Sequence, residues 1–194
     1  MDRVVAVVEG SVLTLSELEL EARVLLLERG GSQAVSAPLG EDTLREALEL
    51  VVSQRLQVLD ADRLQAFPVV ASEVAERVAR LQEKVGGEEE LLAFLALHEA
   101  DLDQLAQILI RGLRAERFLD SRIRLRAQVP EAEVRRYYEA HAASLPGTYA
   151  SLRSVLQQKL AREKYARLAA EELAQVRRAA QVRLVAPFAR EARP

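Results

Sequence analysis

The amino-acid sequence predicts a mainly α-helical bundle with a small β element formed by an N-terminal hairpin and a C-terminal strand. Composition is the first reason. Of the 194 residues, 49% are hydrophobic but only 4% aromatic, and a core of Leu, Val and Ala favours packed helices. Most apolar residues also recur at helical spacing, between breaks marked by glycine or proline. Finally, short runs with β-branched or alternating apolar residues stand near both ends of the chain.

The β element is predicted from residues 3–14 and 180–185. The first segment, RVVAVVEGSVLT, places a turn at Glu9-Gly10-Ser11 between two apolar runs, which is typical of a hairpin. In the second, AQVRLV, Val182 and Leu184 alternate with polar residues. An isolated hairpin is marginally stable. We therefore expect the late strand to pair with the hairpin and bring the two ends of the chain together.

The helices are predicted from apolar spacing and from capping patterns. TLSE at 14–17 and TLRE at 43–46 both place a hydroxyl three residues before a glutamate, as in a capping box. Asp101, followed by Gln104, is a third cap. Residues 31–40 are small and polar and predict a mobile loop. The predicted helices cover residues 14–28, 43–65, 70–85, 88–99, 101–126, 131–142 and 148–180.

Charge and cysteine content exclude several classes of function. The net charge is −3, so no basic excess is present to neutralise a nucleic-acid backbone, and we expect no nucleic-acid partner. Cysteine is absent, which excludes disulfides, thiolate metal sites and cysteine nucleophiles. No apolar run reaches the roughly 18 residues that a membrane span requires.

The few candidate reactive groups are better explained by ordinary structural roles. His98 is expected at a solvated helix end, and His141 near a helix C-terminus, where a cation is favourable. Residues 88–90 are glutamates that suit the first turn of a helix. Of Tyr137 and Tyr138, one ring is expected to pack inward and the other to lie across the surface. We predict no catalytic residue, no metal ligand and no cofactor-binding residue.

Two apolar runs are more informative. Residues 24–27, VLLL, and 105–110, LAQILI, cover every face of their helices. Such helices are either central in a core or keep part of their surface for a partner, and the sequence favours neither. Leu26 and Leu27 are the candidate contacts for such a partner.

The ordered set of segments resembles the SurA-type periplasmic chaperone family, which is related to the PrsA and PpiD foldases. The opening DRVVAVVEGSVLTLSELE (2–19) carries the resemblance best. Further similar segments are 44–63, 69–123, 129–142 and the final AQVRLV. Where this family has a parvulin-type prolyl-isomerase domain inserted, the chain has EAHAASLPGTYA (139–150). The resemblance implies that the isomerase module is missing, so no isomerase activity is expected.

The resemblance also implies one chaperone domain over 1–194. It would comprise a hairpin and helices over 1–128, a linker helix and turn over 129–147, and a long helix with a returning strand over 148–186. No signal peptide is recognised before Asp2, so we expect either a cytosolic protein or a mature form with an added start methionine. The resemblance implies the second, with a periplasmic location.

The function implied by the resemblance is ATP-independent, non-enzymatic holding of unfolded outer-membrane or secreted polypeptides in an apolar cleft. The alternative is a structural or assembly module that binds one dedicated partner or forms a homodimer by exchange of the terminal helix.

Overall fold

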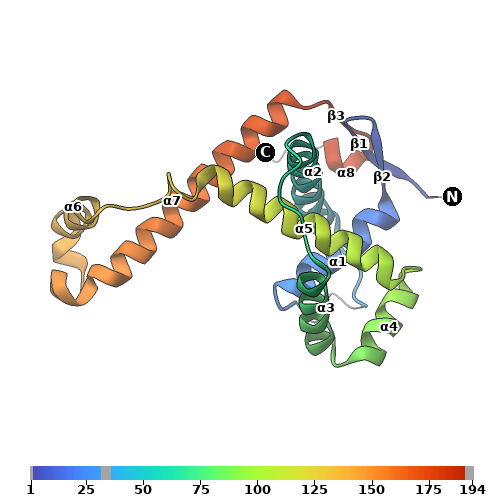
Figure 1. Ribbon diagram of the computed structural model, residues 1–194, viewed down its shortest axis with the longest axis horizontal. Coiled ribbons are helices and arrows are strands. Elements are labelled where there is room, and N and C mark those ends of the chain that lie inside the picture. Colours follow the sequence, from blue (N-terminus) through green and yellow to red (C-terminus); the bar gives the residue numbers. More distant parts are fainter. Residues whose placement is uncertain (1, 32–35, 191–194) are drawn as a thin grey trace. The chain divides into compact units, whose positions relative to one another are not determined.

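The structure is a computed structural model that describes residues 2–31 and 36–190. It is mainly α-helical, with one three-stranded antiparallel sheet, as the sequence predicts (Figure 1). The elements in chain order are β1 (Val4–Val8), β2 (Ser11–Thr14), α1 (Leu15–Glu28), α2 (Glu41–Arg63), α3 (Ala71–Val85), α4 (Glu88–Leu97), α5 (Leu102–Ile123), α6 (Glu131–His141), the 3-10 turn η2 (Ala142–Ser144), α7 (Tyr149–Ala179), β3 (Val182–Leu184) and α8 (Pro187–Arg190).

The chain divides into two compact units. The first contains Met1–Phe118 and Val176–Pro194, and the second contains Leu119–Gln175. The boundaries between the two units fall inside helices, one in α5 and the other in α7. The segment boundaries predicted from the sequence, at residues 128 and 147, instead fall in loops. The description of 1–194 as one chaperone domain stays a prediction.

The sheet brings the two ends of the chain together, as predicted. Glu9 and Gly10 form the hairpin turn with φ of 48° and 85°, the positive values that a two-residue turn matched to strand twist requires. β3 pairs antiparallel with β1, which lies between β2 and β3 (Figure 1). At the end of this pair, the Glu9 N–H donates to the Gln181 carbonyl at 2.9 Å, and the Gln181 N–H donates to Glu9 Oε1 at 2.6 Å.

One core of the first unit lies beneath the sheet. Val5, Ala6 and Val8 of β1 are buried there against α1, α2 and α8. α8 follows β3 and is not predicted from the sequence. Its Phe188 is 6% exposed, and Arg45 Nε of α2 donates to the Phe188 carbonyl at 2.8 Å. A second core joins α1, α3, α4 and α5 through Leu20, Val24, Leu27, Leu81, Leu91, Phe94, Leu95, Leu105, Ile108 and Leu109.

The helix starts confirm two of the three predicted caps. Thr14 and Glu17 form a reciprocal capping box at α1. Asp101 and Gln104 exchange backbone-to-side-chain hydrogen bonds of 2.8 and 3.0 Å at α5. The cap predicted at Thr43 is wrong, because α2 begins at Glu41 after Gly40 and already has two acidic residues in its first turn. α5 ends at Ile123 rather than Arg126. The predicted loop 31–40 lies partly outside the described residues.

The second unit forms its own small cores along α7. Val129 and Val134 bury their side chains with Leu156. We expected one ring of Tyr137 and Tyr138 to pack inward and the other to lie across the surface, but the two residues do not differ in this way: both are half-buried and pack against this core. Both have polar groups to satisfy near the surface: Lys159 Nζ donates to Tyr137 Oη at 2.6 Å, and Tyr138 Oη donates to the Gly147 carbonyl at 3.0 Å. Among the described helices, none is long and apolar enough to cross a membrane.

Replacing Phe188 with alanine is expected to lower the free energy of unfolding by about 3–5 kcal/mol, because the buried ring is lost and a cavity remains. Urea unfolding followed by circular dichroism measures this. Leu125 is 79% exposed, so Leu125→Ala serves as the control and should change stability by less than about 0.5 kcal/mol. Equal effects of the two substitutions would contradict the docking of α8 on α2.

Candidate functional site

A pocket of about 270 Å³ opens where α1, α2 and α5 of the first unit meet. α1 and α5 supply most of its wall, from positions three or four residues apart that share one helix face. α2 supplies Arg55. The lining residues are Glu17, Leu20, Glu21, Arg55, Asp101, Asp103, Gln104, Gln107, Ile108 and Arg111. We call this the three-helix pocket.

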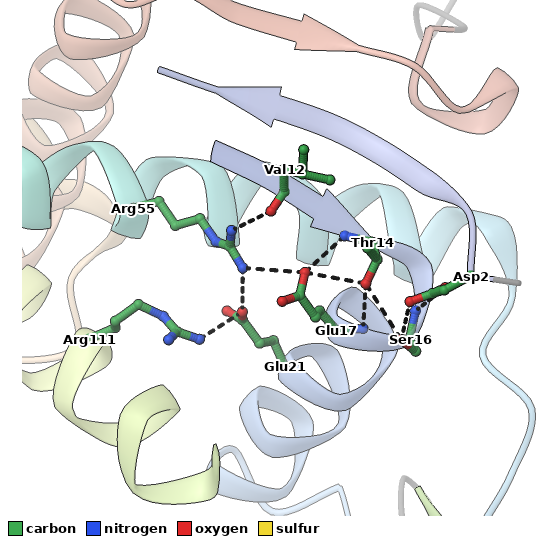
Figure 2. Close-up of polar contacts among 8 residues, drawn as sticks. All are labelled: Asp2, Val12, Thr14, Ser16, Glu17, Glu21, Arg55 and Arg111. Atoms are coloured by element: carbon green, nitrogen blue, oxygen red, sulfur yellow. Dashed lines mark hydrogen bonds and ion pairs between the residues drawn. The ribbon is translucent and has the colours of Figure 1, made fainter. Parts of the chain in front are cut away.

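A buried carboxylate organises the wall of the three-helix pocket (Figure 2). The side chain of Glu21 is 4% exposed, and its Oε1 accepts from Arg55 Nη2 at 3.1 Å and from Arg111 Nη2 at 2.8 Å. Arg55 and Arg111 are 15% and 27% exposed. A carboxylate this buried is tolerated only with charged, hydrogen-bonding partners, and here each partner comes from a different helix. The three charges therefore tie α1, α2 and α5 together.

Arg55 also reaches the edge of the sheet. Its Nη1 donates to the Val12 carbonyl of β2 at 3.3 Å, and its Nη2 lies 4.0 Å from Glu17 Oε2 (Figure 2). β2 is an edge strand, whose carbonyls would otherwise be open to pairing with another chain. The same guanidinium thus supports the pocket wall and covers one carbonyl of this edge.

The exposed residues of the lining are acidic or carry amides, and we call them the mouth of the pocket; its two buried apolar residues we call the base. Leu20 and Ile108 are each 8% exposed and contribute the apolar part of the lining. Asp103 and Gln107 are exposed, and the side chain of neither makes a hydrogen bond or ion pair with any residue in 2–31 or 36–190. Asp101 accepts from the Gln104 N–H, which engages one of its oxygens. The pocket thus offers apolar surface, side-chain amides and carboxylates to the same ligand.

The candidate client contacts do not line this pocket. Leu27 is 1% exposed inside the second core, so its side chain is not on the surface, and the prediction that it touches a client does not fit its position. Leu26 is half-buried beside that core. A client contact at Leu26 stays a prediction.

The histidines lie away from the pocket lining. His98 follows α4 and is half-buried. Its ring packs edge-on against that of Phe94, with 5.0 Å between the ring centroids. His141 is the last residue of α6, as predicted, and its ring stacks on that of Tyr137 with 4.2 Å between the ring centroids. The glutamates 88–90 occupy the first turn of α4. Within the described ranges, no group of three or more His, Asp or Glu side chains is placed to hold a metal ion.

Sequence reasoning missed the Glu21 cluster. Its members are 34 and 90 positions apart in the chain, and each resembles any other charged residue on a helix surface. A weak signal does exist: Glu21 belongs to the α1 segment whose other residues are mostly apolar.

Asp2 fastens the start of the chain to α1, next to this wall (Figure 2). The Ser16 hydroxyl donates to Asp2 Oδ2, and the Ser16 N–H donates to Oδ1 at 3.3 Å. The hydrogen bond from the Ser16 hydroxyl and a second one from the Thr14 side chain, in this order of importance, favour the ionised form of Asp2. They lower its pKa from 3.8 to about 2.

We expect Asp2→Asn to lower the melting temperature at pH 7 but to have little effect at pH 2. A carboxyl whose pKa is depressed by folding stabilises the fold above its unfolded-state pKa. This stabilisation is lost as the pH falls through the folded-state value, here between about pH 4 and pH 2. Thermal unfolding of both proteins across this range measures it. A difference that stays constant down to pH 2 would contradict the assignment.

Replacing Glu21 with glutamine should destabilise the first unit by about 2–4 kcal/mol, since two guanidinium groups lose their counter-charge. Breaking a fully buried pair costs roughly 3–5 kcal/mol, and the partial exposure of Arg111 reduces this. The control is Glu171→Gln, which removes an exposed pair with Arg167 worth about 0.5 kcal/mol or less. Urea unfolding compares them, and similar losses would argue against a structural role of Glu21.

Comparison with models of known protein families gave no match, and comparison with curated proteins gave none either.

Proposed function

We propose that the chain is a non-catalytic, ATP-independent holding chaperone that binds unfolded polypeptide segments. The observation that carries this proposal is the three-helix pocket, whose lining brings apolar, amide and charged side chains together. An unfolded chain exposes the matching groups, namely apolar side chains beside unpaired backbone N–H and C=O groups.

The size and lining of the pocket favour a polypeptide over a small metabolite. Its volume of about 270 Å³ lies just below the range of roughly 300–1,000 Å³ that is usual for small-molecule sites. A pocket of this volume suits one side chain of a polypeptide better than a complete small molecule. Gln107 provides an amide that can donate and accept, as a peptide backbone requires, and Gln104, whose oxygen accepts from the Asp101 N–H, still has its amide N–H groups to donate.

Exposed apolar side chains of α4 and of the start of α5 add surface on which a client could lie. Leu102 stands between Asp101 and Asp103 of the pocket mouth and is 47% exposed. Leu97 and Leu92, at the end of α4 and within it, are 61% and 46% exposed. Apolar contacts are non-directional, so a site of this kind tolerates many client sequences.

The resemblance to SurA-type chaperones supplies the client class and the compartment of this proposal. The family assignment, the periplasmic location, and outer-membrane or secreted proteins as clients are all part of the proposal. The pairing of β3 with β1 and the capped α1 fit the segments on which the resemblance rests.

The test is suppression of aggregation. Chemically unfolded substrate is diluted into buffer with the chain in excess, and light scattering is followed. We expect the wild-type chain to slow aggregation, and Gln107→Trp, which places an indole in the pocket mouth, to do so several-fold less. Gln158→Trp, at an exposed position of α7, is the matched control and should behave as wild type. A chain that has no effect even in excess would refute the proposal.

The same chain could instead serve one dedicated partner or a second copy of itself. Sedimentation at several concentrations, with and without unfolded substrate, separates these outcomes. Broad, weak binding supports the chaperone, whereas one complex of fixed stoichiometry supports the module.

A further inference from the structure

We infer that the three-helix pocket selects polypeptide segments that carry a lysine or arginine side chain. This inference rests on the proposed holding function and names the feature of the client that the pocket reads. It follows from the charge of the lining and from its division into an apolar base and an acidic mouth.

The pocket lining has an excess of negative charge. Four carboxylates line it against two guanidinium groups, which leaves two negative charges net. Both guanidinium groups are already engaged by Glu21, which is 4% exposed. Glu21 and the two guanidinium groups together leave one positive charge, and Arg55 lies 4.0 Å from Glu17. The two net negative charges therefore lie with Asp101 and Asp103.

The positive end of α5 does not cancel this charge. A helix N-terminus corresponds to about half a positive charge, whereas Asp101 and Asp103 carry one negative charge each at that end. The mouth stays negative after this offset. The side chain of Asp103, moreover, has no hydrogen-bond or ion-pair partner among the described residues, so its carboxylate is available to a ligand.

A lysine or arginine side chain matches both parts of the pocket. Its methylene stem can lie on Leu20 and Ile108 while its cationic end meets the carboxylates at the mouth, since such side chains bury their stems and keep their charge near water. An acidic side chain would be repelled at the same mouth. A neutral apolar side chain would make contact with Leu20 and Ile108 but would gain no electrostatic attraction from the carboxylates.

The experiment measures the affinity of three labelled, unstructured peptides by fluorescence anisotropy. They are identical apart from one central residue, which is lysine, Nε-acetyl-lysine or glutamate, flanked by leucines. At low salt we expect the lysine peptide to bind about fivefold more tightly than the acetylated one, the size of a few exposed ion pairs, and the glutamate peptide to bind most weakly. At about 1 M salt the lysine preference should vanish, because the Debye length is then only about 3 Å and the attraction between exposed charges is screened.

Asp103→Asn should reduce the lysine preference about two- to threefold and leave binding of the acetylated peptide unchanged. Glu89→Gln is the control: Glu89 is exposed, lies outside the pocket lining and should leave every affinity as in wild type. Circular dichroism checks that both variants are folded.

Equal binding of the lysine and acetyl-lysine peptides, or a preference that Asp103→Asn does not alter, would overturn this inference and leave the holding function standing. Failure to bind any of the three peptides would count against the holding function itself.

Discussion

The buried carboxylate of Glu21 is the constraint on which the candidate site depends. It lies on α1, is 4% exposed, and receives a guanidinium from α2 and another from α5. A carboxylate cannot stay ionised at such a position without partners, so the three helices must meet where Arg55 and Arg111 can reach it. Their meeting leaves the hollow that we describe as the three-helix pocket.

The same arrangement explains why the pocket is not filled by the chain itself. Apolar residues of α1 and α5 go to the second core, with Val24, Leu27 and Leu105 almost completely buried. The neighbouring faces of these helices carry Glu17, Glu21, Gln107 and Arg111, and charged side chains on facing helices do not interdigitate as leucines do. Space therefore remains on the polar side of the contact, with Leu20 and Ile108 at the boundary.

Closure of the first unit depends on the two ends of the chain. β3 completes the sheet on one side of β1, and α8 then covers part of the core with Phe188. Both outer strands have a carbonyl bonded by an arginine, Val12 by Arg55 and Leu184 by Arg190 at 3.2 Å. Small sheets with open edges invite pairing with other chains, and this feature limits it.

Local sequence patterns were sufficient for most of the secondary structure and for the pairing of the chain ends. Hydrophobic periodicity, the capping pairs at Thr14 and Asp101 and the Glu9-Gly10 turn act between neighbouring residues, so they can be recognised in the sequence alone. At the start of α2, where the sequence interpretation was wrong, two local signals competed. At α2, Thr43 offered a cap, but Gly40 with two following acidic residues begins the helix earlier.

The sequence by itself determined the fold class, the order of the elements up to β3 and the absence of cysteine chemistry, because these follow from composition and short-range spacing. Tertiary structure alone decided the rest. It buried Leu27, half-buried both Tyr137 and Tyr138, placed α8 over the core, and joined Glu21 to arginines 34 and 90 positions away. The physical reason is that the environment of a charged or apolar side chain depends on which helix faces it, and facing helices are far apart in the sequence.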